Sequence, residues 1–325
     1  MYPMLMEGVA IGTYHEEGSR VIHYYVENDD GEEFEITGEL YHALNRADGT
    51  RSLALLEEDK ELKEELKKYH IIRTSRFVRE RGAINRWIVF PVGRIPPKVR
   101  AVLWLINTFL PLLSLLMLAI GLMMPFCCPV DFEMNWDWAA YIFLFLVSIC
   151  LHELGHFIAG AANGYGVSDV GILLLWVIPI GAYVACYERN GVEPAGKKAK
   201  IQFSLAGIEM NLLIAGVMLI IGVLVPAFFV TSLMVAAENG WLAFINLLPS
   251  RGLDGESALS ALCGVESIFS TASGWLFKKE KRRQLYRSGA AGFVSLAFFA
   301  VVCLSRVVLF AIIGISLLLS VLSFF

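Results

Sequence analysis

Residues 150–157 read CLHELGHF, inside a run that is otherwise apolar. His152 and His156 are four residues apart, so on a helix both imidazoles project from one face, one turn apart. Two histidines with this spacing can reach one ion, and zinc takes nitrogen ligands at about 2.0–2.1 Å. Glu153 follows the first histidine and can take a proton from a metal-bound water. The pattern predicts a catalytic metal site.

The apolar surroundings of this motif strengthen the prediction. One alternative is a neutral histidine pair that packs in a helix by chance. Ionisable side chains at membrane depth are costly and usually functional, however. Three of them on one helical turn need a shared partner, and a bound cation supplies one. We therefore favour the metal site.

A catalytic zinc site needs a third protein ligand. No histidine follows His156, so we expect a carboxylate. The candidates in or next to apolar segments are Asp169, Glu209, Glu238, Asp254 and Glu256. Asp254 is favoured because Pro249 and Gly252 interrupt the helix before it and allow its side chain to be aimed into a site. The alternative is that Asp254 caps the next helix.

Two asparagines also lie in apolar segments that could face the site. Asn211 and Asn246 could each hydrogen-bond a substrate peptide or polarise its carbonyl group. Polar contacts between neighbouring helices explain both residues equally well. Glu209 could face the same cavity or pair with a base.

The composition predicts a polytopic α-helical membrane protein with a soluble N-terminal domain. The 325 residues are 56% hydrophobic and only 18% charged, which is less charge than a soluble domain carries. About 20 apolar residues cross a bilayer. About six spans are expected: 101–124, 138–161, 201–225, 228–248 and two within 289–325, where Arg306 divides the apolar stretch. The alternative for 289–325 is a single long span with a surface helix.

Lysine and arginine predict the orientation of these spans. The loop between the first two spans has neither residue, whereas the segment before residue 201 and the segment 249–288 are basic. Basic loops stay on the cytoplasmic side. We therefore expect a multi-pass protein of the cell membrane with both termini and residues 249–288 in the cytoplasm.

Residues 165–186 are apolar but fit this scheme badly, because a full span here would place the following lysines outside. Their glycines and proline also interrupt a helix. We expect a re-entrant or membrane-edge β-hairpin after the HExxH helix. Such backbone persists at membrane depth only when protein or water covers it, which points to a hydrated cavity.

Residues 1–72 predict a soluble α+β domain of winged-helix character. A hairpin is expected over 20–37, around Asp-Asp-Gly. Three short helices should follow, capped by Thr37, by Thr50 or Ser52, and by Asp59. Residues 73–100 carry many arginines and three prolines, so we expect a basic linker that lies against anionic headgroups. Residues 101–288 would then form the catalytic core.

Two motifs about a hundred residues apart give the sequence a family resemblance. HELGH in one span and NLLPSRGLDG after another resemble the motifs of the site-2 protease family of intramembrane zinc metalloproteases. The resemblance implies that His152, His156 and Asp254 bind zinc and that Glu153 is the catalytic glutamate. Asn246 lies at the asparagine of the second motif.

Shorter matches extend this resemblance. AGIEMN, which ends at Asn211, resembles the family's G-x-x-x-N element. IPIGAYV, residues 178–184, resembles its G-G-Y-V strand, with Ala182 in place of a glycine. The N-terminal domain resembles PqqD-type peptide-recognition domains, which occur beside such proteases and imply a ribosomally made peptide as substrate. A generic winged-helix fold with a docking role is the alternative.

We thus predict an intramembrane zinc endopeptidase that cleaves a membrane-associated protein or small peptide. A zinc transporter is a second hypothesis, because intramembrane histidines and acids also line ion paths. A third is a non-catalytic membrane module that binds peptides. The expected partners are lipid and a protein or peptide substrate. A net charge of −4 gives no support for nucleic acid binding.

Overall fold

The computed structural model describes residues 2–6, 9–15, 21–28, 30–79, 84–93, 95–128, 136–187, 196–287 and 289–322. The chain divides into two compact units. The first contains Met1–Arg100 and Gly164–Pro194, and the second contains Ala101–Asn163 and Ala195–Phe325. The predicted hairpin therefore belongs to the same unit as the N-terminal residues.

The N-terminal part of the first unit has an α+β core. Its elements are β1 (Met4–Leu5), β2 (Ala10–His15), β3 (Ile22–Glu27), β4 (Glu33–Ile36), α1 (Gly38–Leu44), α2 (Ala54–Glu58), α3 (Lys60–Lys68) and β5 (Ile72–Arg73). Strands β2, β3 and β4 form one antiparallel sheet, and β1 pairs with β5. Val26, Leu44 and Leu56 are fully buried in the core between sheet and helices.

Local signals positioned most of these elements correctly. Thr37 accepts a hydrogen bond from the Leu40 N–H at 3.2 Å, and Asp59 accepts one from Leu62 at 2.9 Å, so both predicted caps are confirmed. The cap predicted for α2 is wrong, because that helix starts after Leu53 without a side-chain cap. The N–H of Thr50 instead donates to Asp48 in a local turn. Strands β3 and β4 pair as predicted, but Asp29 of their turn lies outside the described residues.

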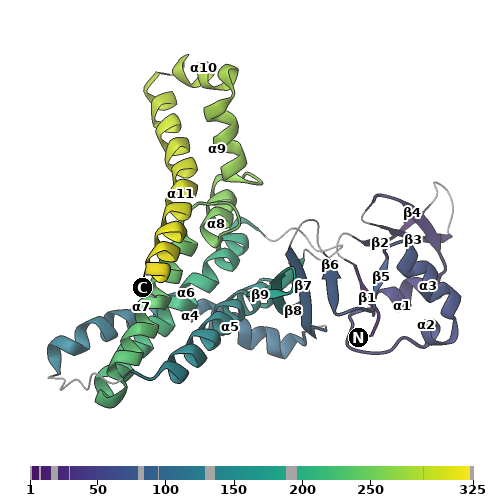
Figure 1. Cartoon of the computed structure of the whole chain (residues 1–325). Coiled ribbons are helices and arrows are strands. Elements are labelled where there is room, and N and C mark those ends of the chain that lie inside the picture. Colours follow the sequence, from purple (N-terminus) through teal and green to yellow (C-terminus); the bar gives the residue numbers. More distant parts are fainter. Residues whose placement is uncertain are drawn as a thin grey trace. The chain divides into compact units, whose positions relative to one another are not determined.

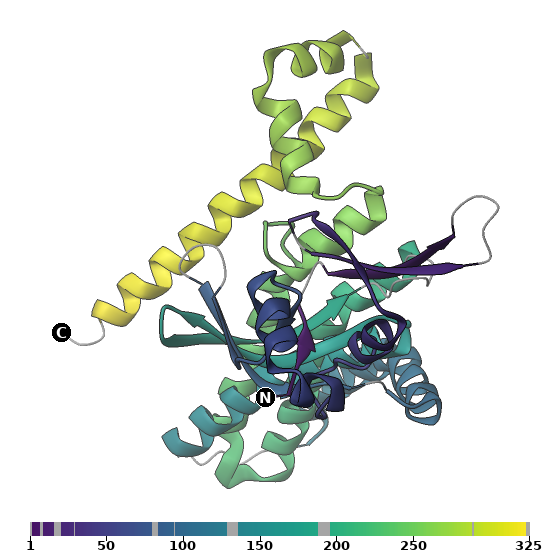
Figure 2. The ribbon, with the colours of Figure 1, turned by 90° about the vertical axis from the view of Figure 1, so that its right-hand side faces the viewer.

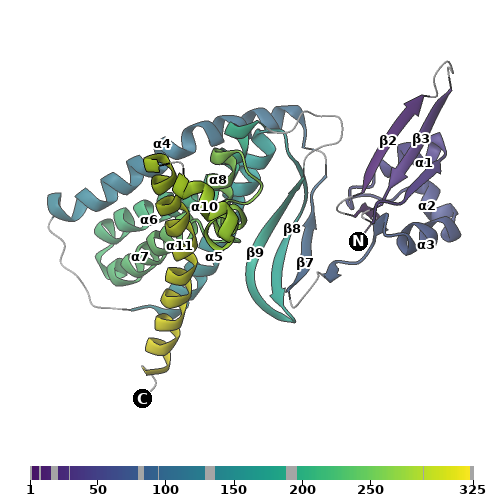
Figure 3. The same cartoon turned by 90° about the horizontal axis from the view of Figure 1, so that it is seen from above.

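A second, four-stranded antiparallel sheet completes the unit (Figure 3). Its strands in order are β6 (Phe77–Arg79), β7 (Ile84–Pro91), β8 (Gly166–Leu175) and β9 (Ile178–Tyr187). The prediction of a linker over 73–100 is wrong, since β6 and β7 lie there. β7 pairs with β8 about 80 residues away, from Ile84 with Leu175 to Pro91 with Asp169. Pro91 is tolerated because it ends the strand.

The apolar stretch 165–186 forms β8 and β9, which pair with each other through a turn at Trp176 and Val177. Trp176, Val177 and Ile178 are 71%, 79% and 62% exposed. Aromatic and apolar residues exposed together are typical of a membrane interface. The membrane-edge position of this hairpin stays a prediction.

A buried ion pair joins the two-stranded β1–β5 sheet to the four-stranded sheet. The Arg73 guanidinium on β5 donates to Asp169 Oδ2 on β8 at 2.9 Å, and Asp169 is fully buried. Ser168 Oγ donates to the same carboxylate at 2.7 Å and Tyr183 Oη at 2.6 Å. Burial and the contact with Asp169 raise the pKa of Tyr183, so its hydroxyl stays a donor. The N-terminal residues are thereby tied to the hairpin.

The second unit is helical (Figure 1). Its elements are α4 (Pro97–Cys127), α5 (Trp138–Ala162), α6 (Lys197–Leu224), the 3₁₀ turn η1 (Pro226–Phe228), α7 (Phe229–Leu247), α8 (Asp254–Cys263), α9 (Ile268–Phe277), α10 (Lys279–Arg287) and α11 (Gly289–Leu322). In the described part of the chain, four helices are long and apolar enough to cross a membrane: α4, α5, α6 and η1 with α7. They correspond to the first four predicted spans.

The prediction of two separate spans within 289–325 is wrong for the described residues. α11 is one continuous helix of 34 residues that runs through Arg306. Its first half lies beside α9, and α10 connects the two (Figure 2). The Arg306 guanidinium lies 5.1 Å from the centre of the Phe269 ring. This cation–π contact accommodates the charge, so no helix break is needed.

Glycines bring α6 close to its neighbours. A Cβ atom added to Gly121 of α4 would lie 2.6 Å from the carbonyl oxygen of Gly216. One added to Gly155 of α5 would lie 2.5 Å from the carbonyl oxygen of Ala206. Small residues allow backbones to approach in this way inside membranes. Gly155 therefore allows α5 and α6 to pack closely.

The Arg73–Asp169 pair yields a test of how the first unit is held together. Substitution Asp169→Ala should cost about 3–5 kcal/mol, because it leaves a buried guanidinium unpaired. Hydrogen exchange of the β8 and β9 amides in the full chain should become roughly a hundredfold faster. The matched control is Glu35→Ala, which removes an exposed pair with His23 and should cost at most about 1 kcal/mol. Equal protection in both variants would contradict this assignment.

Candidate metal centre

Three side chains converge where α5 meets the start of α8. His152 Nε2 and His156 Nε2 lie 3.3 Å apart, and each lies 3.3 Å from Asp254 Oδ2. Two ligand atoms held about 2.0–2.1 Å from zinc at a tetrahedral angle are separated by about 3.3–3.4 Å. The three atoms thus have the spacing of three corners of a zinc tetrahedron.

The turn between α7 and α8 aims Asp254 at the histidines. α7 ends at Leu247, and Gly252 has a φ of +91°, a conformation that favours glycine. A Cβ atom on Gly255 would lie 2.2 Å from the carbonyl oxygen of Leu247. Only glycine therefore lets the start of α8 pack on the end of α7. The N-cap of α8 is Leu253, and Asp254 Oδ2 has no hydrogen-bond partner among the described residues, so this oxygen is available to the site.

The electrostatics of Asp254 suit a metal ligand. Its Oδ2 atom is buried and accepts no hydrogen bond from the described residues. Burial favours the neutral carboxyl, but the interactions with His152 and His156 outweigh that effect and lower the pKa of Asp254 to about 2. The group is therefore an anion beside two imidazole nitrogens, which is the protonation state that a metal ligand needs.

α6 shapes the other side of the centre. A Cβ atom built on Gly207 would lie 2.5 Å from both His152 Nε2 and His156 Nε2. The absence of a side chain at this position keeps space free beside both ligand nitrogens. Together with the unpartnered Asp254 oxygen, this space fits a bound cation, and two imidazoles with one carboxylate are donors that suit zinc.

The outward nitrogens of both histidines also meet α6. His156 Nδ1 lies 2.9 Å from the carbonyl oxygen of Phe203, and His152 Nδ1 lies 3.0 Å from the side-chain amide of Asn211. These contacts turn both Nε2 atoms toward Asp254. We call Phe203, Gly207 and Asn211 the α6 strip; their spacing of four residues places them on one helix face.

The position of Asn211 fits the second of its two explanations, a polar contact between neighbouring helices. Its side chain is fully buried and contacts His152, so it is not exposed to a substrate. The roles of Phe203 and Gly207 were missed altogether. Their four-residue spacing from Asn211 was visible in the sequence, but only the register between α5 and α6 shows that these residues face the histidines.

Glu153 and Asn246 are the remaining predicted site residues. Glu153 is half-buried on the same turn of α5 as His152. Asn246 is half-buried near the end of α7, beside the residues that position α8. Within the described part of the chain, the Asn246 side chain makes no hydrogen bond. Its amide is therefore free to meet a ligand.

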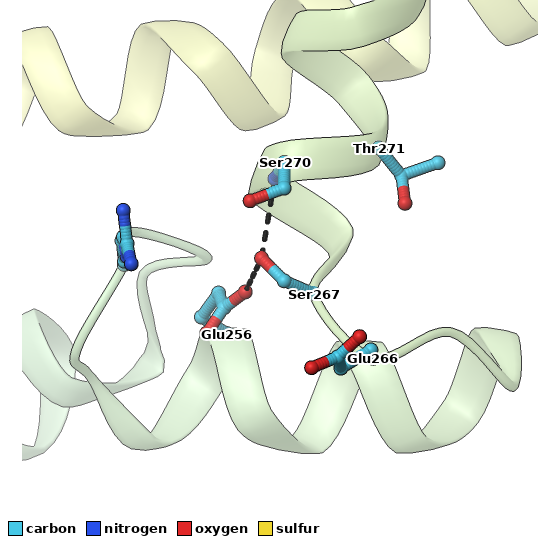
Figure 4. Close-up of a pocket in the computed structure, with 6 residues that line it drawn as sticks. Glu256, Glu266, Ser267, Ser270 and Thr271 are labelled. Atoms are coloured by element: carbon cyan, nitrogen blue, oxygen red, sulfur yellow. Dashed lines mark hydrogen bonds between the residues drawn. The ribbon is translucent and has the colours of Figure 1, made fainter. Parts of the chain in front are cut away.

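The other carboxylates considered as the third ligand lie elsewhere. Tyr141 donates a hydrogen bond to Glu238, and Asp169 belongs to the first unit. Glu256 accepts a hydrogen bond from Ser267 at 2.8 Å in a polar pocket between α8 and α9 (Figure 4). Glu209 is half-buried on α6. In the part of the chain that the structure describes, His152, His156 and Asp254 form the one group that could hold a metal.

A comparison with known protein families matches the part of the chain that carries the HExxH motif. Residues 140–238 match the model of peptidase family M50, a region that covers α5, α6 and much of α7. This segment is therefore similar to peptidase family M50, the site-2 protease family. The M50 match includes both histidines and Glu153 and ends before Asp254. Together with the four apolar helices α4 to α7, this match supports a membrane protein.

One relative of this chain is the zinc metalloprotease MJ0392 of Methanocaldococcus jannaschii. It is 33% identical over 132 residues, which cover 38% of this chain and 34% of that protein. The chain thus spans about a third of the length of the relative it matches. No solved structure matches the chain.

The α6 strip provides a test of the metal centre that is independent of catalysis. Substitution Gly207→Ala should lower zinc affinity more than tenfold, because the added methyl group displaces both ligand nitrogens. The control is Gly240→Ala on α7, where a Cβ atom meets nothing within 4 Å. Zinc content per folded chain is the measurement. A Gly207→Ala protein that keeps wild-type zinc affinity would refute this site.

Proposed function

We propose that the second unit is an intramembrane zinc endopeptidase. The observation that carries the proposal is the 3.3 Å triangle of His152 Nε2, His156 Nε2 and Asp254 Oδ2. The HExxH motif and the M50 match support the same reaction class. Zinc held by these three residues would act as a Lewis acid and lower the pKa of water, which is its usual role in metallopeptidases.

The side chains around the centre have separate roles in hydrolysis. Glu153 takes a proton from the attacking water as the water oxygen bonds to the peptide carbonyl carbon. As the C–N bond breaks, Glu153 returns that proton to the leaving amine. Asn246 donates a hydrogen bond to the carbonyl oxygen of the substrate and stabilises the negative charge that develops there. Asn211 has no part in this step because it is buried against His152.

The substrate we propose is a membrane-associated protein or small peptide in an extended conformation. β9 is an edge strand of its sheet, and its outer backbone groups could pair with such a strand. A peptide strand added there would follow the recognition mode of other sheet-edge binders. We also propose that both termini are cytoplasmic. A ribosomally made peptide, recruited by the N-terminal residues, is one substrate class that fits this arrangement.

The structure adds no support for the two other hypotheses, a zinc transporter and a non-catalytic membrane module that binds peptides. A transporter needs a series of binding sites along an ion path. The described residues hold a single candidate group, and both membrane histidines belong to it. A non-catalytic module does not need a glutamate beside the metal ligands, yet Glu153 is retained.

Substitution Glu153→Gln tests the proposed reaction. It should reduce hydrolysis by about 10²–10⁴-fold, because the general base is lost, while one zinc per chain remains bound. Comparative peptidomics of membranes that contain wild type or the variant should reveal a peptide that accumulates uncut only in the variant. Glu238→Gln, on α7, serves as the control and should cleave normally. Cleavage by Glu153→Gln at the wild-type rate would refute the mechanism.

A further inference from the structure

We infer that Asn211 is a positioning residue that fixes the ring of His152 for metal binding. This inference rests on zinc binding at the proposed site. It differs from the substrate-binding role that the sequence indicated.

The Asn211 side-chain amide is enclosed by protein and contacts His152. Asn211 is 0% exposed, and its Nδ2 atom lies 3.0 Å from His152 Nδ1. Its Oδ1 atom is buried and has no partner among the described residues. A fully buried asparagine that contacts the outward nitrogen of a metal-binding histidine acts through that histidine.

Metal binding determines which ring nitrogen of His152 carries the proton. Its Nε2 atom faces Asp254 and His156, so Nε2 is the ligand nitrogen. A neutral imidazole that ligates through Nε2 carries its proton on Nδ1 and needs an acceptor there. A half-turn of the Asn211 amide exchanges Nδ2 for Oδ1 and provides that acceptor. Asparagine can thus donate to the unprotonated nitrogen without metal and accept from Nδ1–H with metal bound.

The ring of His156 is held by α6 in a similar way. Its Nδ1–H donates to the carbonyl oxygen of Phe203, eight residues before Asn211 on α6. α6 therefore presents one polar partner to each histidine, the Phe203 carbonyl oxygen to His156 and the Asn211 amide to His152, and Gly207 lies between the two. Partners of this kind fix ring orientation and strengthen the ligand, and their loss costs about 10–100-fold in metal affinity.

Zinc affinity of the full-length protein in detergent tests the inference, measured by competition with a chelator. Asn211→Leu, which keeps the volume but removes the acceptor, should bind zinc about 10–100-fold more weakly. Asn211→Asp supplies the acceptor and should bind zinc nearly as tightly as wild type. Asn211→Ala provides a second truncation in case leucine prevents folding, and the same loss of affinity is expected.

The matched control is Asn239→Leu. Asn239 is also a fully buried asparagine of the helical unit, but it donates to Ser148 Oγ and to the carbonyl oxygen of Val235. This variant should lose stability and keep wild-type zinc affinity. Equal affinities of Asn211→Leu, Asn211→Ala and wild type would overturn the inference, as would an equal loss in Asn239→Leu.

The absorption spectrum of the cobalt(II)-substituted protein gives a second readout. It should change in Asn211→Leu and remain as in wild type in Asn239→Leu, because only the former alters the ligand geometry. These measurements are separate from hydrolysis. If wild type binds zinc but cleaves nothing, the proposed function fails and the role of Asn211 stands. If Glu153→Gln is inactive while Asn211→Leu binds zinc normally, the proposed function stands and the role of Asn211 fails.

Discussion

The structure depends on holding two imidazole nitrogens and one carboxylate oxygen 3.3 Å apart in a largely apolar unit. A buried carboxylate without a hydrogen bond is costly, and a shared cation removes that cost. The packing of the surrounding helices serves this arrangement. Gly155 brings α6 against α5, Gly207 leaves space beside both nitrogens, and Gly255 seats the start of α8 on the end of α7.

The same constraint explains why some helices supply the metal ligands and another orients them. α5 supplies the two histidines and Glu153, and α8 supplies Asp254. α6 contacts the Nδ1 atoms of both histidines. A helix face that supplies no metal ligand thus helps to orient the ligands. The first unit is stabilised separately by the Arg73–Asp169 pair. Because β8 follows α5 after three residues, the chain connects that unit directly to the helix that carries the metal ligands.

Features that rest on local spacing could be predicted from the sequence. The four-residue spacing of His152 and His156 implied a shared face, and the lack of later histidines led to Asp254. Features that depend on distant partners could not be predicted. The pairing of β7 with β8 joins segments about 80 residues apart, and the contact of Arg306 with Phe269 removed the expected helix break. The burial of Asn211 depends on how α6 is rotated against α5.

X-ray absorption at the zinc edge of the full-length protein tests the central claim most directly. The account predicts one zinc per chain with only nitrogen and oxygen neighbours at about 2.0–2.2 Å, and with the outer-shell scattering of two imidazoles. Asp254→Ala should lower zinc occupancy. Cys150 lies only two residues before His152 and is exposed. A sulfur neighbour at about 2.3 Å, or full zinc occupancy in Asp254→Ala, would contradict the account.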